Sequence, residues 1–544
     1  MKDVLIIGSG IAGMECAVRC AQLGVHVTLA SPVPSERAQS VMAAGGINAV
    51  LADHDPGDSV ACHIEDTLKG GAYLGGKKAV TGLCEHGEEI IHFLESIGTV
   101  FTVDENGKPA IRTSGGQSYR RTHYCGSSTG KQIVSALVME SRRYEAAGLI
   151  KRRLGCWFYS ALIQDGTCFG ALLFDEHARE LEAVYADAVV IATGGQNALF
   201  GKTTGSTQCD GYAAGKLFTQ GALLKNLEFI QYHPTTIETP QKRMLVSEAV
   251  RGEGGRLFYL ENDRRVYFME DKYGPRGNLM TRDVVSREIH SSGKDVFLDA
   301  SFMDKALIER KFPEVRELCM KYLDIDIAEE PIPVAPSVHF FMGGLAVHLD
   351  HETNIKNLFA VGECASMYHG ANRIGGNSLL TAMYGGKVAA EEIARRSADT
   401  GHPDMTGYIE EEWEHLKQKL ETQSPFPAMY IRDMLADTMR QYAGIVRSED
   451  GLMTGLRQID NYISIAERIK YDSSVPPYAN YSLSGILAIA RAVLTSAEER
   501  KESRGAHYRS DFSEMDHSYD GATLISYDDG LYRVRFDKEG EYES

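Results

Sequence analysis

The sequence contains no apolar run long enough to cross a membrane. A transmembrane helix needs roughly 18 or more consecutive apolar residues, and the 544-residue chain stays below that length throughout. The first predicted strand begins at Val4, so we expect no secretory signal peptide before it. These absences predict a cytoplasmic protein that would reach the inner face of the cell membrane only through partners.

Closely spaced cysteines are also missing. Of the ten cysteines, only Cys16 and Cys20 stand close together, on one face of a predicted helix. No second pair accompanies them, and no spacing resembles an iron–sulfur or zinc site. We therefore predict no metal site and expect reduced, buried thiols.

Positive charge is scarce as well. Lysine and arginine number 57 against 75 aspartate and glutamate residues, which gives a formal net charge of -18. This balance argues against the binding of nucleic acid or of an anionic membrane surface. An anionic substrate would need a local cationic pocket, because the overall field of the protein does not attract it.

The chain does contain a β-turn-α-β unit at its start. Val4–Ile7 is a short apolar strand, Gly8-Ser-Gly-Ile-Ala-Gly13 follows as a GxGxxG turn, and Met14–Leu23 has helical spacing before a second strand at His26–Ala30. In such a unit the pyrophosphate of a dinucleotide lies at the helix N-terminus. A dinucleotide site is favoured over a mere tight turn. The second strand usually ends in an acid that binds the ribose, and Ser31 stands at that position here.

Two later strands end in the same way. Ala188–Ala192 runs into Thr193-Gly-Gly195, and Leu358–Val361 runs into Gly362-Glu363. Three such endings predict one nucleotide-binding sheet built from segments that are distant in sequence. The fold class that follows is α/β, or α+β overall, with a Rossmann-like domain.

His369–Leu380 combines glycines, one cation and a helix start. Three glycines and Arg373 precede a helical pattern that begins at Leu379. Helix N-termini attract anions through their free N–H groups and their dipole, and a planar guanidinium suits a carboxylate. For this run alone, the alternative is a left-handed turn with one solvated arginine.

Ten stretches spread over nearly the whole chain form an ordered set of motifs. They are Gly8–Gly13, Gly45–Asn48, Ala192–Gly195, Leu227–Thr235, Ser247–Gly255, Arg282–Arg287, His339–Gly344, Gly362–Cys364, His369–Leu380 and Glu502–His507. In this order they resemble the flavoprotein subunits of fumarate reductase and succinate dehydrogenase, together with L-aspartate oxidase. The resemblance implies FAD, a capping domain over its isoalloxazine ring, and a dicarboxylate held between the two.

The resemblance also implies catalytic residues. Arg282 would deliver a proton to the substrate carbon, with Glu248 and Arg251 as the relay behind it. Because an arginine is effectively always protonated, such an acid must regain its proton quickly, which a neighbouring carboxylate allows. The alternative is an ordinary Arg282–Asp283 surface pair.

The binding residues follow from the same resemblance. Arg373 and His339 would hold one substrate carboxylate, and His233 and Ser247 would hold the other. Taken singly, each histidine has an ordinary structural alternative, and the serine could be a helix cap. The implied cofactor-binding residues are Gly8, Gly10, Ala12, Gly13, Ser31, Ser40, Ala44, Gly45, Gly46, Thr193, Gly194, Asp210, Glu363, Ser378 and Leu379.

The chain departs from the family pattern at three positions. Gln39 stands where respiratory members carry the histidine that links FAD covalently, so we expect non-covalent FAD. Ala44 replaces the usual glutamine before the Gly-Gly pair. Ser114 stands where L-aspartate oxidase has an acidic residue that helps to recognise the substrate amino group. A neutral serine favours fumarate or succinate over aspartate.

We predict four domains from these patterns. An FAD-binding domain covers 1–230 and 351–400, an inserted capping domain 231–350, a helical domain 401–500 and a C-terminal segment 501–544. Helical patterns at 410–422 and 459–470 indicate the helical domain. The last segment is a polar tail with weak strand signals near 524–526 and 532–536.

The prediction for function is an FAD oxidoreductase acting on CH–CH groups. It would interconvert fumarate and succinate by hydride transfer at FAD N5, within a larger complex in electron transport such as anaerobic respiration. The expected partner is an iron–sulfur subunit, and a membrane-anchor or heterodisulfide-reductase-like subunit is a further candidate. The rivals are an L-aspartate oxidase of quinolinate synthesis and a non-catalytic flavin scaffold.

Overall fold

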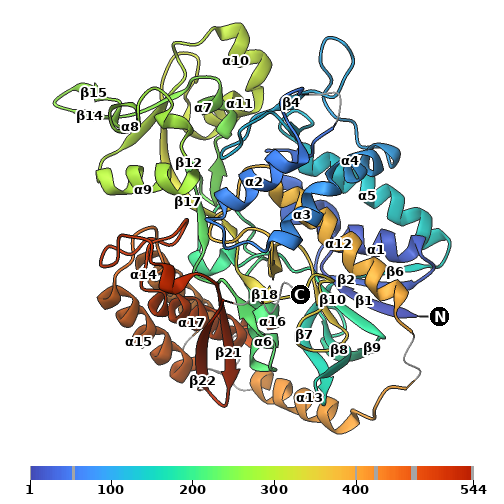
Figure 1. Ribbon diagram of the computed structural model, residues 1–544. Helices are drawn as coiled ribbons and strands as arrows, with labels where there is room; N and C mark the ends of the chain where they lie inside the picture. Colours follow the sequence, from blue (N-terminus) through green and yellow to red (C-terminus); the bar gives the residue numbers. More distant parts are fainter. Residues whose placement is uncertain are drawn as a thin grey trace.

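A five-stranded parallel sheet, called the central sheet below, lies in the right-hand part of Figure 1, next to the N-terminus. The computed structural model describes residues 2–51, 55–397, 401–421, 427–466, 468, 475–538 and 540. The strand order is β19-β10-β1-β2-β6, with bounds Leu358–Ala360, Ala188–Ile191, Asp3–Ile7, His26–Ser31 and Ile150–Leu154. The three strands that end in glycines, β1, β10 and β19, are neighbours. This confirms the predicted α/β sheet built from distant segments.

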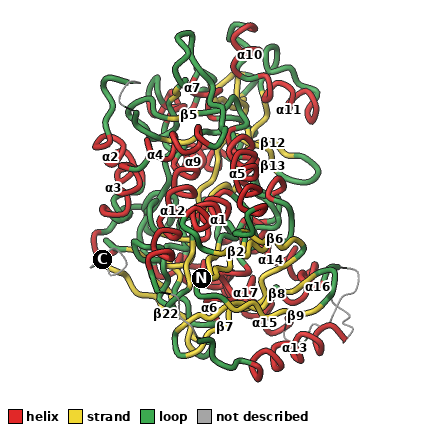
Figure 2. The backbone as a smooth tube through the Cα atoms, turned by 90° about the vertical axis from the view of Figure 1, so that its right-hand side faces the viewer, coloured by secondary structure: helices red, strands yellow, loops and turns green. Residues whose placement is uncertain are grey.

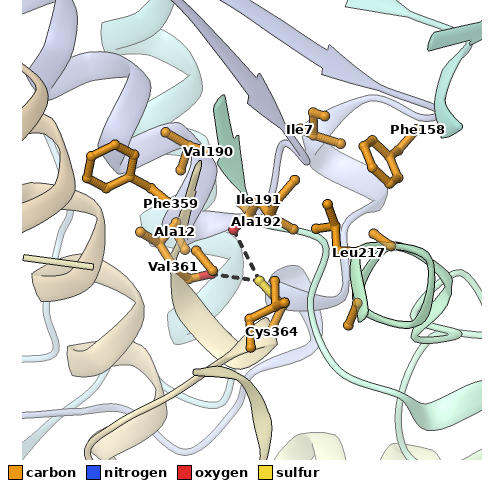
Figure 3. Packing of buried hydrophobic residues seen from close by; sticks show 14 of the residues in the cluster. Ile7, Ala12, Phe158, Val190, Ile191, Ala192, Leu217, Phe359, Val361 and Cys364 are labelled. Carbon is orange, nitrogen blue, oxygen red and sulfur yellow. Dashed lines mark hydrogen bonds between the residues drawn. The ribbon is translucent and has the colours of Figure 1, made fainter. Parts of the chain in front are cut away.

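Helices cover this sheet. Because its strands are buried beneath them, the strands are continuous apolar runs in the sequence. Helix α1 (Ile11–Gln22) packs against α5 (Thr129–Ala146) and α12 (Asn377–Arg395). Helices α1 and α12 approach so closely that a Cβ added to Gly386 would lie 2.7 Å from the carbonyl oxygen of Ala12. Figure 3 shows the adjoining core, in which the thiol of Cys364 donates to the carbonyls of Ile191 and Val361.

A six-stranded antiparallel sheet carries a second core. Its order is β13-β12-β17-β16-β14-β15, with bounds Arg243–Leu245, Ile230–Glu238, Ile332–Phe341, Val296–Asp299, Arg256–Glu261 and Arg264–Val266. Five short helices accompany it, namely α7 (Glu248–Gly252), α8 (Phe268–Tyr273), α9 (Arg282–Ser292), α10 (Lys305–Lys311) and α11 (Pro313–Leu323). This core comprises buried residues between Ile237 and Val334, which supports the predicted capping domain. The domain boundaries stay a prediction.

The strand pair β12–β17 runs from one core to the other. Ile230 and Phe341, at one end of the pair, belong to the main core, whereas Ile237 and Ile332, at the other end, belong to the second core. Residues in the middle of both strands therefore face the junction between the two cores. His233 and His339 occupy this middle region.

The remaining N-terminal elements surround the central sheet. Strands β3 (Ile47–Asn48), β4 (Ile111–Arg112) and β5 (Thr122–His123) form one small sheet. Strands β7 (Cys156–Gln164), β8 (Thr167–Asp175) and β9 (Glu180–Tyr185) form another, and the turn between β7 and β8 has Asp165 and Gly166 at positive φ. Helices α2 (Val60–Gly70), α3 (Lys77–Glu85), α4 (Gly87–Ser96) and α6 (Tyr212–Thr219) complete this part.

The helical region after residue 400 contains α13 (Thr406–Glu421), α14 (Ala428–Tyr442), α15 (Glu449–Ala466), α16 (Pro477–Tyr481) and α17 (Leu483–Glu499). The helix predicted at 459–470 begins earlier, at Glu449, and positions 467, 469 and 470 lie outside the described residues. Helices α10 and α11 lie at the opposite end of the molecule from α13 in both views (Figures 1 and 2). None of the helices traced in the described ranges is long and apolar enough to span a bilayer.

The end of the chain returns to earlier parts of the fold. Strands β21 (Ala522–Asp528) and β22 (Leu531–Asp537) extend a sheet in the order β20-β18-β11-β21-β22, beside β11 (Leu224–Lys225), β18 (Gly344–Ala346) and β20 (Ala365–Ser366). The strand signals near 524–526 and 532–536 are thus confirmed, but the segment is a pair of sheet strands rather than a polar tail. Strand β21 pairs with β11, where Leu224 stands opposite Ile525, and the side-chain bond between Thr523 and Glu228 spans a similar distance of 295 residues in the sequence.

Candidate active site

A cavity of about 480 Å³ opens at the carboxyl ends of the central strands and reaches β13 and α11. Crevices at this edge of an open α/β sheet are where ligands bind, and the volume is typical of a ligand pocket. Most residues predicted to bind the cofactor line this cavity. They are Gly8, Gly10, Ala12, Ser31, Ser40, Ala44, Gly45, Gly46, Thr193, Gly194, Asp210, Glu363, Ser378 and Leu379.

Two glycines of the GxGxxG turn, Gly8 and Gly13, leave no space for a side chain. Gly8 has φ +111°, and a Cβ there would lie 2.3 Å from the carbonyl oxygen of Ala192. A Cβ on Gly13 would lie 2.0 Å from the carbonyl oxygen of Gly8. Gly13 therefore packs α1 against the turn, and it does not line the cavity in the described part of the chain. The N-cap Gly10 has no side chain to cap the first turn of α1, and the N–H of Ile11 in that turn donates to Ser40 Oγ at 3.1 Å. The other free N–H groups at this helix end suit an anion.

A buried amide organises the opposite wall of the cavity. The Nδ2 of Asn48 donates to the carbonyl of Gly375 and to Asn377 Oδ1, both at 2.7 Å. Its Oδ1 accepts from Gln117 Nε2 and Thr122 Oγ1, again at 2.7 Å. Asn48 thereby joins β3 to β5 and the loop before it, and to the start of α12 and the loop before that helix. It was quoted within a motif but not predicted as a site residue, because its partners lie up to 329 residues away.

The backbone next to this amide is equally constrained. Gly376 has φ +83° and precedes α12, and a Cβ there would lie 2.0 Å from Asn48 Oδ1. The guanidinium of Arg112 donates to the carbonyls of Ala44 and Gly45 at 2.8 and 2.7 Å. A flat ligand could thus approach the Ala44–Gly45 backbone and the N-terminus of α12 without meeting side chains.

Gln231 bridges two arginines that face the cavity. Its Oε1 accepts from Arg282 Nη1 at 3.0 Å and from Arg373 Nη2 at 2.8 Å. Both arginines line the cavity, so it contains the local cationic pocket that an anionic substrate needs. Gln231 was not predicted as a site residue, although its place two residues before His233 on β12 was a usable signal.

Burial does not remove the charge of Arg373 at neutral pH. Burial and the neighbouring Arg282 lower the pKa of Arg373 to about 9, which still leaves the guanidinium protonated at pH 7. Arg373 lies over the ring of Phe340, with 4.5 Å between the guanidinium carbon and the ring centroid. Its position is therefore fixed by an aromatic face and by Gln231.

Glu248 joins Arg282 to Arg251. Glu248 Oε2 accepts from Arg282 Nη2 and its Oε1 accepts from Arg251 Nη2, each at 3.0 Å. Burial acts to raise the pKa of Glu248, but Arg282 and Arg251 outweigh it and hold the pKa well below its usual value. The carboxylate is therefore ionised and connects the cavity-facing Arg282 to the fully buried Arg251. Neither Glu248 nor Arg251 lines the cavity, as far as the described chain shows.

Two histidines and one serine complete the predicted binding set. The rings of His233 and His339 lie 5.3 Å apart between centroids, and His339 Nδ1 lies 2.9 Å from Thr204 Oγ1. Burial first, and then Arg282, lower the pKa of both histidines well below the usual value, so both rings are neutral at pH 7. Ser247 caps α7 through Ala249 N and also lines the cavity.

His233 shows one feature that indicates a ligand. Its Nε2 is buried and has no hydrogen-bond partner in the described structure. A buried polar atom without a partner costs free energy, so a bound acceptor or donor at this position would satisfy it. Arg282, Arg373, His339 and Ser247 line the cavity, whereas His233 lies beside His339 and is not part of the lining in the described structure. The two arginines and His339 can bind the carboxylates of a dianion.

Two predicted cofactor residues are acids, of which Asp210 is buried and Glu363 is half-buried. Burial raises the pKa of Glu363 to about 7, and its Oε1 accepts from the N–H of Phe341 at 3.0 Å. Burial also raises the pKa of Asp210, whose Oδ1 accepts from the N–H of Tyr212. The hydroxyl of Ser31 donates to the carbonyl of Val33 at 2.8 Å, which leaves its oxygen free to accept.

Comparison with known proteins places this site in a family. A family model described as FAD binding domain matches residues 3–379, and one described as fumarate reductase flavoprotein C-term matches residues 432–539. The chain belongs to the succinate dehydrogenase and fumarate reductase flavoprotein family, which also includes L-aspartate oxidase.

The family relatives match over almost their whole length. The succinate dehydrogenase flavoprotein subunit of Bacillus subtilis is 36% identical, covering 94% of this chain and 92% of the relative. A fumarate reductase (CoM/CoB) subunit of Methanothermobacter marburgensis is 34% identical, covering 96% and 97%. An L-aspartate oxidase of Nostoc is 32% identical, covering 96% and 93%.

A solved structure of E. coli quinol fumarate reductase with a mutated FrdA protein has a TM-score of 0.91 and 29% identity. It covers 99% of this chain and 97% of that chain. The likeness extends from the central sheet to the C-terminal strands and confirms the predicted family and fold class.

The FAD of this family fits the observed cavity. The glycines of the first turn and the glycine N-cap of α1 suit a diphosphate, and the exposed backbone at Ala44–Gly46 suits a flat ring. Gln39, at the start of the short helix Gln39–Met42, lines the same cavity. Ser114 does not line it within the described residues, and its hydroxyl lies 3.0 Å from Thr122 Oγ1.

Proposed function

We propose that this flavoprotein interconverts fumarate and succinate. The observation that carries the proposal is the position of Arg282, which faces the cavity between Gln231 and Glu248, at 3.0 Å from each. A guanidinium that faces substrate on one side and a buried carboxylate on the other can give up a proton and regain it. An Arg282–Asp283 surface pair does not fit, because Asp283 accepts from Asn372 instead.

In the reductive direction, FAD that has been reduced by the electron donor would supply a hydride to one alkene carbon. Arg282 protonates the other carbon, and Glu248 and Arg251 return the proton to Arg282. Arg373 and His339 hold one carboxylate, and the side of the cavity near His233 and Ser247 holds the other. Arg282 and Arg373 also stabilise the negative charge that develops on the substrate during hydride transfer.

L-aspartate oxidase is the second candidate, and relatives of that name belong to the family. Aspartate differs from succinate by one ammonium group, which a buried site must pair with a counter-charge or with several acceptors. Ser114 supplies no charge, and its hydroxyl lies against Thr122. A charge-assisted hydrogen bond is worth about 1.5–3 kcal/mol, or roughly 10- to 150-fold in affinity. This favours the unsubstituted dicarboxylate.

Two assays of purified protein test the proposal. With reduced viologen as donor, we expect rapid, fumarate-dependent oxidation of the viologen. With L-aspartate under air, we expect no useful rate of iminoaspartate formation. Efficient aspartate oxidation together with slow fumarate reduction would overturn the proposal and favour the oxidase. Inactivity in both assays of an FAD-loaded protein would favour a non-catalytic flavin scaffold.

A substitution of Arg282 tests its role separately. Arg282→Lys keeps the positive charge but loses the planar fork that contacts both Gln231 and Glu248. We expect FAD and dicarboxylate binding to persist, with turnover reduced about 10²-fold or more. If turnover of the variant stays within about twofold of the parent, Arg282 takes no part in the reaction.

We also propose that FAD is bound non-covalently, since Gln39 lines the cavity where respiratory members have the linking histidine. Electrons would reach the site from an iron–sulfur partner, either soluble or held by a membrane-anchor or heterodisulfide-reductase-like subunit. In the described residues, no group of three or more histidine, cysteine or acidic side chains could hold a metal ion. A cytoplasmic location is part of the same proposal.

A further inference from the structure

The helical region contributes an aromatic side chain to the wall of the cofactor cavity. Tyr478, in α16, lines the cavity together with Trp157 of β7 and Asp210, which precedes α6. Tyr478 stands 268 residues after Asp210. None of the motifs that indicated FAD binding includes Tyr478, and its presence here results from the packing of the helical region onto the central part.

Tyr478 is bonded to a predicted cofactor residue. Its hydroxyl donates to both carboxylate oxygens of Asp210, at 2.9 and 3.0 Å. Arg432 of α14 approaches the same carboxylate at 3.5 Å and donates to Ser482 Oγ and to the carbonyl of Ala479, so it also fixes α16. The side chains that satisfy buried Asp210 therefore both come from the helical region.

The aromatic ring of Tyr478 is held on two sides. It stacks on Trp157 with centroids 3.8 Å apart and an interplanar angle of 27°. It meets the edges of Tyr212 at 5.7 Å and of Tyr481 at 5.3 Å. A side chain fixed in this way forms a preorganised wall, because little conformational freedom remains to be lost when a ligand binds.

Burial also keeps the phenol in its donating form. Burial raises the pKa of Tyr478 well above its usual value, and the charge of Asp210 raises it further. The hydroxyl therefore stays protonated and continues to donate to Asp210 across the physiological range.

From these contacts we propose that Tyr478 is a cofactor-binding residue. Through it, the helical region contacts the bound dinucleotide and holds Asp210 in place. This contact would help to hold FAD without a covalent bond, since Gln39 stands at the position of the linking histidine and cannot form that bond. The proposal rests on the FAD of the family and is independent of which substrate the protein reduces or oxidises.

The test measures FAD binding rather than turnover. The apoprotein is titrated with FAD, and the dissociation constant is read from the change in flavin fluorescence for the parent, Tyr478→Phe and Tyr478→Ala. Phe keeps the stacked ring and loses only the hydroxyl. Tyr478→Phe loses the hydrogen bond from the hydroxyl to Asp210, so Asp210 is no longer held in place for FAD. We therefore expect the dissociation constant for FAD to rise about tenfold in Tyr478→Phe, and more in Tyr478→Ala, which also loses the ring.

Tyr481→Phe is the matched control. Tyr481 lies in the same helix and the same aromatic group, but its buried hydroxyl has no hydrogen-bond partner in the described structure. We expect its FAD dissociation constant to stay within about twofold of the parent. The rise in Tm on adding saturating FAD should be smaller than the parental rise in Tyr478→Phe and unchanged in Tyr481→Phe.

The outcomes separate the proposal from a purely structural role. If both Tyr478 variants bind FAD within about twofold of the parent, Tyr478 does not retain the cofactor and the proposal is wrong. If Tyr478→Ala fails to fold, the Phe variant decides alone. A lower Tm of the apoprotein with an unchanged FAD-induced rise would also contradict the proposal, because it would show a packing role only.

Discussion

Replacing Glu248 by Gln would separate proton resupply from substrate binding. Glu248 is the carboxylate shared by Arg282 and Arg251, at 3.0 Å from each guanidinium. The side chains of Arg282 and Glu248 are 11% and 16% exposed, so water screens this pair only weakly. Gln keeps the size and one acceptor oxygen but removes the negative charge on which both arginines depend.

The expected magnitudes follow from that geometry. Two unit charges about 4 Å apart attract by about 4 kcal/mol at an effective dielectric constant of 20, and breaking a buried pair costs about 3–5 kcal/mol. The free energy of unfolding of the variant should therefore fall by a few kcal/mol without substrate. If the carboxylate relays protons to Arg282, kcat should fall about 10²- to 10⁴-fold. The dissociation constant for the dicarboxylate should not rise, because a repelling negative charge has been removed.

The assay is steady-state fumarate reduction by reduced viologen, with dicarboxylate binding followed separately through the flavin absorbance. Glu253→Gln is the control, since Glu253 belongs to the same sequence motif but pairs with Lys311 at the surface. It should match the parent in both measurements. The reasoning is refuted if kcat of Glu248→Gln stays within about threefold of the parent, or if dicarboxylate binding weakens as much as turnover falls.

Three further predictions concern the cofactor and the stability of the protein. Because Gln39 cannot link FAD as a histidine does, acid precipitation should leave the yellow colour in the supernatant, and flavin fluorescence that stays with the denatured band on a gel would contradict this. Asn48→Ala removes four hydrogen bonds of 2.7 Å, three of them buried and one partly buried. It should lower the free energy of unfolding by about 2–5 kcal/mol, which urea titration measures; a loss below about 0.5 kcal/mol would mean that these bonds do not stabilise the fold. Burial raises the pKa of Glu15 from its usual 4.5 to about 7, although Arg19 opposes the shift, so the parent loses stability as pH rises from 4.5 to 7, by up to about 3 kcal/mol. Glu15→Gln should lose less, so its Tm should rise relative to the parent between pH 5 and 8, and a Tm difference that does not vary with pH would be inconsistent with this.

The sequence by itself determined the kind of fold and the family. The GxGxxG turn, two further strand-to-glycine endings and the ordered motifs predicted a nucleotide-binding α/β sheet, because a strand, its turn and the following helix are encoded by neighbouring residues. The resemblance carried by these motifs also named cofactor-binding residues from Gly8 to Leu379, and all of them except Gly13 line the cavity. Helix boundaries were less accurate, as the start of α15 at Glu449 shows, because helix ends depend on packing as well as on local pattern.

Only the tertiary structure decided which of these residues act together. Gln231 meets Arg282 across 51 residues and Arg373 across 142, and periodicity carries no information over such distances. The tertiary structure also showed Gly13 to be a packing glycine, joined the C-terminal strands to β11 and brought Tyr478 into the cofactor cavity. The physical reason is that burial of apolar surface is not directional: the burial pattern fixes which face of an element is covered, whereas the packed structure fixes which distant element covers it.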